Sequence, residues 1–474
     1  MNLISNIKYT SLSQGVKILT QLIGMLVFAK YLNPADFGII AMTTVVVNFI
    51  NIIRDIGTSA SIIQRENVSQ ELKSSLFWLN TTIGCLLFFI MFTIANKISL
   101  FFNSPELNFI LPLIAISLPI NSCTSIHMAL LERESKFKLI SIIEIFSSIL
   151  ALTSSVIAAI NNLGAYSIVI QIVVYSILSG VGFVSVAKFM PMFVFSIKEI
   201  KSIFNFSYNL VSFNFINYFS RNLDQVIIGR FYSSDILGAY SLAYRIMLFP
   251  VQNITAVLSR SLFPIMSRIN NDKRKSSFEY TRILLIILMI VPPLMVLVAL
   301  LSKDIIGFFL GGKWNLVPEI IFWLAPTAIL QSLVSTTGTI FMSYGKPNVL
   351  FRISLFNCII QVSSFVFGVF FDVVTLAKFY FLANFIIFIP NMFISFKMSG
   401  VEVTAFLKKV LPILFSIFIM IIVVFSVNDF ILAEGGGLVF SVFLKFAFGV
   451  ITYLITMCLF FHRTFKEMVM TPIG

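Results

Sequence analysis

The sequence contains little charge, few acidic residues and little cysteine. Charged side chains make up 11% of its 474 residues, with 20 Asp and Glu against 33 Lys and Arg. A soluble domain carries about 25% charged residues, so a fold that faces water over most of its surface is excluded. The chain has only four cysteines, and all of them fall in apolar segments. This pattern indicates small apolar side chains and excludes a disulfide framework.

Apolar residues are what the sequence has in excess. They make up 58% of the chain, and the mean hydropathy is +0.99. Because unpaired backbone polar groups are not tolerated in hydrocarbon, apolar runs of about 20 residues predict membrane-spanning helices. The predicted fold is an all-α integral membrane protein with about fourteen transmembrane helices, at 12–31, 37–61, 76–95, 108–131, 139–160, 164–188, 205–230, 238–266, 283–301, 319–344, 349–371, 375–397, 409–427 and 438–461.

Lys and Arg alternate in number between successive predicted connectors. Connectors on one side of the membrane hold 21 of these cations, and those on the other side hold six. The positive-inside rule places the cation-rich side, together with the N- and C-termini, in the cytoplasm. Most of the formal net charge of +13 therefore reflects topology, and no nucleic-acid partner is predicted.

Two parts of the chain, 200 residues apart, share a pattern of polar residues. A stripe on the first predicted helix recurs on the seventh, and a glycine opens the next helix in both copies, as Gly38 and Gly238. The stripe consists of Gln14, Lys17, Gln21 and Gly24 in the first copy and of Asn214, Asn217, Arg221 and Asp224 in the second. Because six helices separate the copies, both enter the membrane in the same direction. The repeat predicts two six-helix lobes, 1–200 and 201–400, around a central cavity, with two accessory helices in 401–474.

The prediction of a site rests on five cations inside predicted spans, where each costs about 2.5–3.5 kcal/mol at mid-bilayer. They are Lys17, Arg54, Arg221, Arg245 and Arg260. Acidic and uncharged polar residues on the same four helices accompany them, namely Asp55, Asp224, Gln14, Gln21, Asn48, Asn51, Asn214, Asn217 and Gln252. Together these side chains predict one hydrated, cation-rich cavity, which suits an anionic passenger.

Two other interpretations of the deep cations remain open. Lys17 and Arg260 lie close enough to the cytoplasmic ends of their helices for their side chains to extend to the membrane surface. The pairs Arg54–Asp55 and Arg221–Asp224 would otherwise neutralise each other and fix helix packing.

Short motifs follow one another along nearly the whole chain. In the first half they are Leu32-Asn33-Pro34-Ala35-Asp36-Phe37-Gly38, Asp55-Ile56-Gly57, Ile62-Ile63-Gln64-Arg65 and Phe77-Trp78-Leu79-Asn80. In the second half they are Leu237-Gly238-Ala239-Tyr240-Ser241-Leu242-Ala243-Tyr244, Leu262-Phe263-Pro264 and Gly312-Lys313-Trp314-Asn315. With these motifs the chain resembles the Wzx-type polysaccharide flippases of the multidrug/oligosaccharidyl-lipid/polysaccharide (MOP) exporter superfamily. The branch that it resembles most is that of the colanic acid exporter.

The resemblance implies two six-helix lobes around a V-shaped cavity, in the bacterial inner membrane. It implies a flippase that moves an undecaprenyl-diphosphate-linked oligosaccharide repeat unit from the inner to the outer leaflet, for O-antigen, capsule or exopolysaccharide biosynthesis. The implied partners are this lipid-linked substrate, membrane lipids, a polysaccharide polymerase and other assembly proteins. No cofactor, metal or catalytic residue is predicted.

A hydrated cavity with guanidinium groups replaces the hydration that a diphosphate and its sugars lose inside a membrane. We expect Lys17 and Arg260 to receive the diphosphate near the cytoplasmic mouth, and the three deeper arginines to form the path onward. Asp55 and Asp224 would keep the cations from binding too tightly or take a coupling proton. Alternating access of the two lobes would then expose the head group to each side in turn.

Two other classes of protein compete with a flippase. A multidrug or cation antiporter of the same superfamily would need a cavity dominated by carboxylates and aromatic rings, whereas here the deep cations outnumber the deep acids. A polysaccharide polymerase or lipid-dependent glycosyltransferase would need catalytic groups on a large outer loop, and the longest predicted one, about 302–318, offers only Lys303, Asp304 and Lys313. The sequence also lacks a phosphate-binding Gly-x-x-x-x-Gly-Lys-[Ser/Thr] loop, so we predict a transporter that is no enzyme.

Overall fold

The computed structural model describes residues 3–54, 58, 62–63, 68–197, 199–201, 218, 222–434 and 438–470. Side chains are described for these residues except 3–8, 10, 250, 256–257, 260, 428–434, 438–439 and 461–470. Within these ranges the chain is helical apart from short connections and one longer segment, 187–196, and contains no strand. The predicted all-α class is therefore confirmed.

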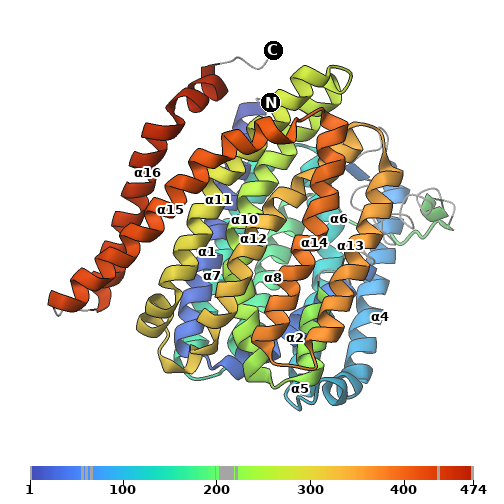
Figure 1. The fold of residues 1–474 in the computed structure, drawn as a ribbon. Helices are drawn as coiled ribbons and strands as arrows, with labels where there is room; N and C mark the ends of the chain where they lie inside the picture. Colours follow the sequence, from blue (N-terminus) through green and yellow to red (C-terminus); the bar gives the residue numbers. More distant parts are fainter. Residues whose placement is uncertain are drawn as a thin grey trace. The chain divides into compact units, whose positions relative to one another are not determined.

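Contacts along the chain divide it into two compact units, Met1–Gly238 and Ala239–Gly474. The helices of the first unit include α1 (Leu3–Tyr31), α2 (Pro34–Arg54), α4 (Gln70–Phe102), α5 (Leu107–Ala115), α6 (Ser117–Arg133), α7 (Phe137–Ile160) and α8 (Tyr166–Val186) (Figure 1). The helix α10 (Ser234–Ile269) begins in the first unit and continues in the second. The second unit goes on with α11 (Lys273–Phe309), η1 (Gly312–Trp314), α12 (Leu316–Ser343), α13 (Pro347–Gly368), α14 (Val373–Ser399), α15 (Val403–Glu434) and α16 (Leu438–Met470).

Twelve helices in the described part of the chain are long and apolar enough to cross a membrane. They coincide with twelve of the fourteen predicted spans, with α5 and α6 together forming one of them, so the chain is a multi-pass membrane protein. The predicted span 205–230 lies mostly outside the described residues. The span 238–266 falls within α10, which is helical; several of its side chains lie outside the described part of the chain, and it is not among the twelve. The number of fourteen crossings stays a prediction.

The helices pair in the same way inside each unit. In the first unit, α4 contacts α6, α6 contacts α8, and α7 contacts α8. These four helices are the third to sixth predicted spans. In the second unit, α11 contacts α12, α12 contacts α14, and α13 contacts α14, which are the same pairs six predicted spans later. The hairpin of α15 and α16 packs against α11 (Figure 1). This shared pairing supports the parallel repeat. The lobe limits near 200 and 400 stay predictions.

The predicted span 108–131 coincides with the candidate span Leu107–Arg133, but it consists of two helices and not of one. They are α5 and α6, which meet at Ile116. Pro119 has no N–H to bond the carbonyl of Ala115, so the regular helical ladder is interrupted at this point.

The predicted outer loop at about 302–318 is wrong, because most of it is helix. The helix α11 continues to Phe309, and only a short connection containing η1 separates it from α12. Asp304 therefore lies on a helix and not on a loop.

The start of α2 explains the structural role of Asp36 in its motif. The carboxylate of Asp36 accepts hydrogen bonds from the backbone N–H groups of Asn33 and Ala165, each at 3.0 Å. The first of these bonds caps α2, in the manner of the acidic residue of a capping box. The second ties α2 to the connection that precedes α8.

Gly38 and Gly238 take part in a reciprocal close contact within the first unit. A Cβ atom at Gly38 would lie 1.9 Å from the carbonyl oxygen of Ser234, and one at Gly238 would lie 1.8 Å from that of Pro34. Only glycine permits such an approach. The contacting residues of the two copies differ by 200 in number, as the predicted repeat requires.

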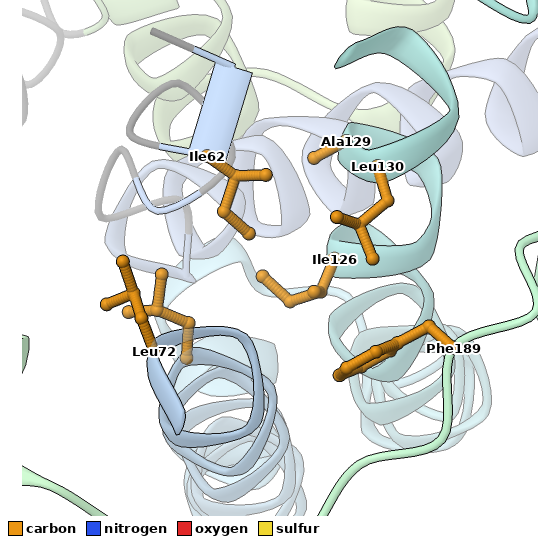
Figure 2. Packing of buried hydrophobic residues seen from close by; sticks show 7 residues of the cluster. Ile62, Leu72, Ile126, Ala129, Leu130 and Phe189 are labelled. Atoms are coloured by element: carbon orange, nitrogen blue, oxygen red, sulfur yellow. The ribbon is translucent and has the colours of Figure 1, made fainter. Parts of the chain in front are cut away.

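A cluster of buried apolar side chains holds the segment after α2 against α4 and α6 (Figure 2). Ile62, from that segment, is fully buried, and the guanidinium of Arg133 at the end of α6 donates a hydrogen bond to its carbonyl oxygen at 2.6 Å. The other members of the cluster are Leu72, Leu76, Ile126, Ala129, Leu130 and Phe189. Because Ile62 lies only a few residues after Thr58, the cluster also restricts where Thr58 can be.

Deep polar groups of the second unit are paired between helices. The hydroxyl of Tyr280 on α11 lies 3.1 Å from that of Thr336 on α12 and donates to that of Ser395 on α14 at 3.2 Å. Lys445 of α16 forms an ion pair with Asp304 of α11, with an Nζ–Oδ2 distance of 2.6 Å. The Lys445 side chain is 7% exposed. No role was predicted for Lys445, although it too is a cation inside a span.

Replacement of Gly84 tests the packing of α4 against α6. A Cβ atom at Gly84 would lie 2.4 Å from Oγ and 2.6 Å from Cβ of Ser122. We expect Gly84→Ala to lower stability by about 1–3 kcal/mol through overpacking, although alanine is the better helix former by about 1 kcal/mol. Thermal unfolding of the purified protein measures this change. Gly15→Ala is the matched control, because nothing lies within 4 Å of a Cβ there, and equal stability of the two variants would contradict the packing described.

Removal of one member of the Lys445–Asp304 pair tests its contribution to the attachment of α16. We expect Lys445→Met to reduce stability by on the order of 3 kcal/mol, because it leaves a carboxylate unpaired inside the membrane. The double variant Lys445→Met/Asp304→Asn should recover most of that loss, since no unpaired charge remains. Protein yield in membranes and thermal unfolding provide the measurement. A double variant no more stable than the single one would argue against the pair.

Candidate functional site

The first unit contains a polar cavity of about 430 Å³ between its membrane-spanning helices. Its charged lining residues are Arg54, Glu132 and Glu144, and its amides are Asn80 and Asn121. Hydroxyl groups line it as well, from Thr58, Ser122, Thr124, Ser125, Tyr175 and Ser179. Because polar groups inside a membrane bundle are costly, such a concentration marks a candidate functional site.

Five helices and the segment after α2 bring these side chains together. The helix α2 ends at Arg54 and is followed by Thr58, while α4, α7 and α8 each contribute one or more lining residues. The largest share comes from α6, whose lining residues include 121, 125, 128 and 132. These positions are spaced by three or four residues and therefore share one face of the helix.

Charges of both signs are nearly balanced in and around the cavity. Glu144 of α7 forms an ion pair with Lys17 of α1, with an Oε1–Nζ distance of 2.6 Å. The Glu144 side chain is 11% exposed and that of Lys17 is 30% exposed, so the pair is largely withdrawn from solvent. Arg54 and Glu132 are half-buried and line the same cavity. In the described residues, no group of three or more His, Cys, Asp and Glu side chains is placed to hold a metal ion.

Neutral polar side chains form a hydrogen-bonded wall on one side of the cavity. The amide nitrogen of Asn80 donates to the hydroxyls of Thr58 and Ser125, each at 2.9 Å. The Thr58 hydroxyl lies 3.2 Å from the amide oxygen of Asn80, and the Ser125 hydroxyl donates to the carbonyl of Ser122 at 2.8 Å. These bonds connect the segment after α2 with α4 and α6, so this wall is held in place before any ligand arrives.

Ser122 lines the cavity, but its hydroxyl is packed against α4. The residue is 1% exposed, its Oγ lies beside Gly84, and this oxygen has no hydrogen-bond partner in the described part of the chain. A buried polar group without a partner costs about 1–3 kcal/mol.

The predicted cations are only partly brought together by the structure. Lys17 and Arg54 belong to the first unit, and both are connected to the cavity, Arg54 directly and Lys17 through Glu144. Arg245 is half-buried on α10 in the second unit. The predicted residues Arg221, Asp55, Asn214 and Asn217 lie outside the described residues, and so does the side chain of Arg260.

The remaining predicted residues differ in their surroundings. Asp224 is 1% exposed, and its Oδ1 accepts a hydrogen bond from the N–H of Gln225 at 2.8 Å. Asn51 is half-buried, and its Oδ1 has no partner among the residues described. Four residues are exposed, namely Gln14, Gln21, Asn48 and Gln252. A single passage shared by all of these residues stays a prediction.

Sequence reasoning missed most of the cavity. It assigned no role to Glu132, Glu144, Asn121, Ser122 or Tyr175. A signal was present in α6, where amide and hydroxyl residues at 121, 122, 124 and 125 interrupt an otherwise apolar span. What the sequence does not contain is the partner of each polar face, since that depends on which helices pack together.

The chain was compared with known families, proteins and structures. Residues 27–318 match the family of polysaccharide biosynthesis proteins. The chain is 27% identical to the teichuronic acid biosynthesis protein TuaB of Bacillus subtilis (strain 168), over 74% of this chain and 73% of that protein. It is 23% identical to the lipopolysaccharide biosynthesis protein WzxC of Escherichia coli (strain K12), over 77% of this chain and 75% of that protein.

The fold is similar to a solved structure of the lipid II flippase MurJ in an inward closed conformation. The TM-score is 0.76 at 18% sequence identity, and the similarity covers 97% of this chain and 100% of that one. The resemblance carried by the sequence motifs is confirmed at the level of the family. Because the family match extends over more than half of its residues, the chain belongs to the polysaccharide biosynthesis protein family.

Proposed function

We propose that the chain is a flippase that moves undecaprenyl-diphosphate-linked oligosaccharide repeat units from the inner to the outer leaflet. The products served would be O-antigen, capsule or exopolysaccharide. Membership in the polysaccharide biosynthesis family supports this function, and so do the roles named for its relatives, which are teichuronic acid and lipopolysaccharide biosynthesis. The protein acts as a transporter and not as an enzyme, in the inner membrane, with both termini in the cytoplasm.

The observation that carries the proposal is the charged, hydroxyl-lined cavity inside a bundle of apolar helices. The obstacle to flipping is the polar head group, because the bilayer core excludes a diphosphate and its sugars. A guanidinium and neutral hydrogen-bonding groups replace the water that the head group gives up. The polyprenyl tail needs no such site, since it is soluble in the lipid.

The cations divide the work according to their positions. Arg54 binds the diphosphate in the cavity through charge-assisted hydrogen bonds. Lys17 forms an ion pair with Glu144, so an arriving diphosphate competes with that carboxylate for the lysine. The side chains of Arg221, Arg245 and Arg260 continue the path, and Asp55 and Asp224 moderate it or take a coupling proton.

Transport is powered from outside the chain. No nucleotide-binding loop is present in the sequence, so an ion gradient or the consumption of the product at the outer surface must supply the free energy. A polysaccharide polymerase and other assembly proteins are the partners that would consume the product. The two lobes open to each side in turn.

A cation antiporter is a second candidate, and one observation favours it. The cavity holds two carboxylates, Glu132 and Glu144, against one guanidinium, so within it the cations do not outnumber the acids. An antiporter would use these carboxylates to bind a cationic drug and a counter-ion in turn. Deletion of the gene separates the two functions, because loss of an antiporter raises drug sensitivity, whereas loss of a flippase causes lipid-linked repeat units to accumulate.

Replacement of Arg54 tests the proposed diphosphate contact. We expect Arg54→Ala to lower surface polysaccharide about tenfold or more at equal protein level in the membrane, because a hydrogen bond to a charged group contributes about 1.5–3 kcal/mol. The assay measures surface glycan in cells that lack their own copy of the gene. Lys97→Ala, at an exposed cation on α4, is the matched control. Wild-type export by Arg54→Ala would exclude the contact.

Separate replacement of Lys17 and Glu144 distinguishes a packing role of their pair from a transport role. We expect both Lys17→Met and Glu144→Gln to reduce the amount of folded protein, since each leaves one charge unpaired in the membrane. The double variant Lys17→Met/Glu144→Gln should restore the protein level but not export, because the receiving cation is gone. Immunoblots of membranes and surface glycan measure the two effects. Full export by the double variant would show that the pair serves only helix packing.

A further inference from the structure

We propose that the cavity of the first unit is the docking site for the sugars of the transported glycan, while Arg54, one of its lining residues, holds the diphosphate. This inference rests on the proposed flippase function and names the part of the substrate that the cavity recognises. The cavity would then contribute to the choice of glycan and would not serve only as a neutral passage.

The chemistry of the lining is that of a carbohydrate site. Sugar hydroxyls donate and accept hydrogen bonds at once, and they need partners that do the same. The cavity supplies six hydroxyls and two amides, all of which combine donor and acceptor capacity. Glu132 and Glu144 add carboxylate oxygens, which accept hydrogen bonds from neighbouring hydroxyls of a ring.

Part of the polar lining has a fixed geometry. Asn80 donates hydrogen bonds to the hydroxyls of Thr58 and Ser125, which joins the segment after α2 to α4 and α6. A docking glycan therefore meets donors and acceptors that are already ordered.

The size and the apolar part of the lining also fit a glycan. About 430 Å³ lies within the usual range of small-molecule sites, about 300–1,000 Å³, and far exceeds the space of one water or one bare ion. Met128, Ala129 and Phe183 line the cavity between the polar groups. Sugar rings have apolar C–H faces as well as hydroxyl edges, so a lining of both kinds suits them.

The balance of charge argues against other occupants. A bare metal cation would be repelled by the guanidinium of Arg54, and a second phosphate would be repelled by Glu132 and Glu144. A neutral polyol meets neither objection. The two carboxylates therefore face the sugars, and the diphosphate remains at Arg54.

Binding of two lipids that differ only in their sugars tests the proposal. The full-length protein in lipid nanodiscs would be titrated with undecaprenyl diphosphate and with the undecaprenyl-diphosphate-linked oligosaccharide extracted from its host cells. We expect Asn121→Ala and Tyr175→Phe each to weaken binding of the glycolipid about five- to tenfold, as loss of one hydrogen bond would, and to leave binding of undecaprenyl diphosphate unchanged. Thr153→Ala, which removes an exposed hydroxyl on α7, should bind both lipids like the wild type.

A second measurement does not depend on these variants being fully active. Asn121→Cys, in a chain whose four native cysteines are replaced by serine, would be treated with a small polar methanethiosulfonate reagent. We expect the glycolipid to slow modification at 121 at least fivefold and undecaprenyl diphosphate to have no effect. Modification at a cysteine in place of Thr153 should not depend on either lipid.

The outcomes separate the docking site from the function itself. If the wild type binds the glycolipid and the Asn121 and Tyr175 variants bind it equally well, with no protection at 121, the cavity holds only water and the inference is wrong. If these variants lose a dependence on sodium or pH but not the preference for sugars, the cavity is an ion site and the inference is again wrong. If the wild type binds neither lipid, the proposed flippase function falls, and the docking site with it.

Discussion

A side chain that carries charge or a hydroxyl finds no water in hydrocarbon, and this constraint organises the first unit. Many hydroxyls there bond a carbonyl of their own helix, as Thr43 and Ser155 do, whereas charged and amide groups are matched by side chains from neighbouring elements. Lys17 meets Glu144 across α1 and α7, and Asn80 joins Thr58 to Ser125. Because polar groups need one another, they gather in one place and enclose a cavity. The same condition that keeps the bundle stable therefore also creates a site with room for a polar passenger.

Several residues of the motifs that carry the family resemblance have a structural role. Asp36 caps α2 and fastens it to the connection before α8, and Gly38 allows a backbone to pass where any side chain would collide. Trp78 donates from its indole nitrogen to the carbonyl of Met192 at 2.8 Å. Among the motif residues that the structure describes, Asn80 alone lines the cavity. Features that identify the family are thus largely distinct from those that would select its cargo.

The sequence predicted where the helices lie along the chain better than it predicted which helices pack against one another. Apolar runs located twelve of the spans, because hydropathy is a local property, but they missed the break at Ile116 and the extension of α11 through Asp304. The site was less accessible to such reasoning. A single polar residue such as Glu144 is visible in the sequence, yet its partner Lys17 lies 127 positions earlier, and only the packing of α1 against α7 joins them. Likewise, the ion-pair partner of Lys445 follows only from the packing of α16 against α11.

The bond from Ala165 to Asp36 has a mechanical consequence. It fastens the start of α2 to the start of α8, and the buried cluster around Ile62 fastens the far end of the same region to α4 and α6. With both ends secured, these helices cannot easily spread to admit a bulkier guest. Relatives that handle different polymers would then have to differ in individual side chains that line the cavity and not in the positions of these helices.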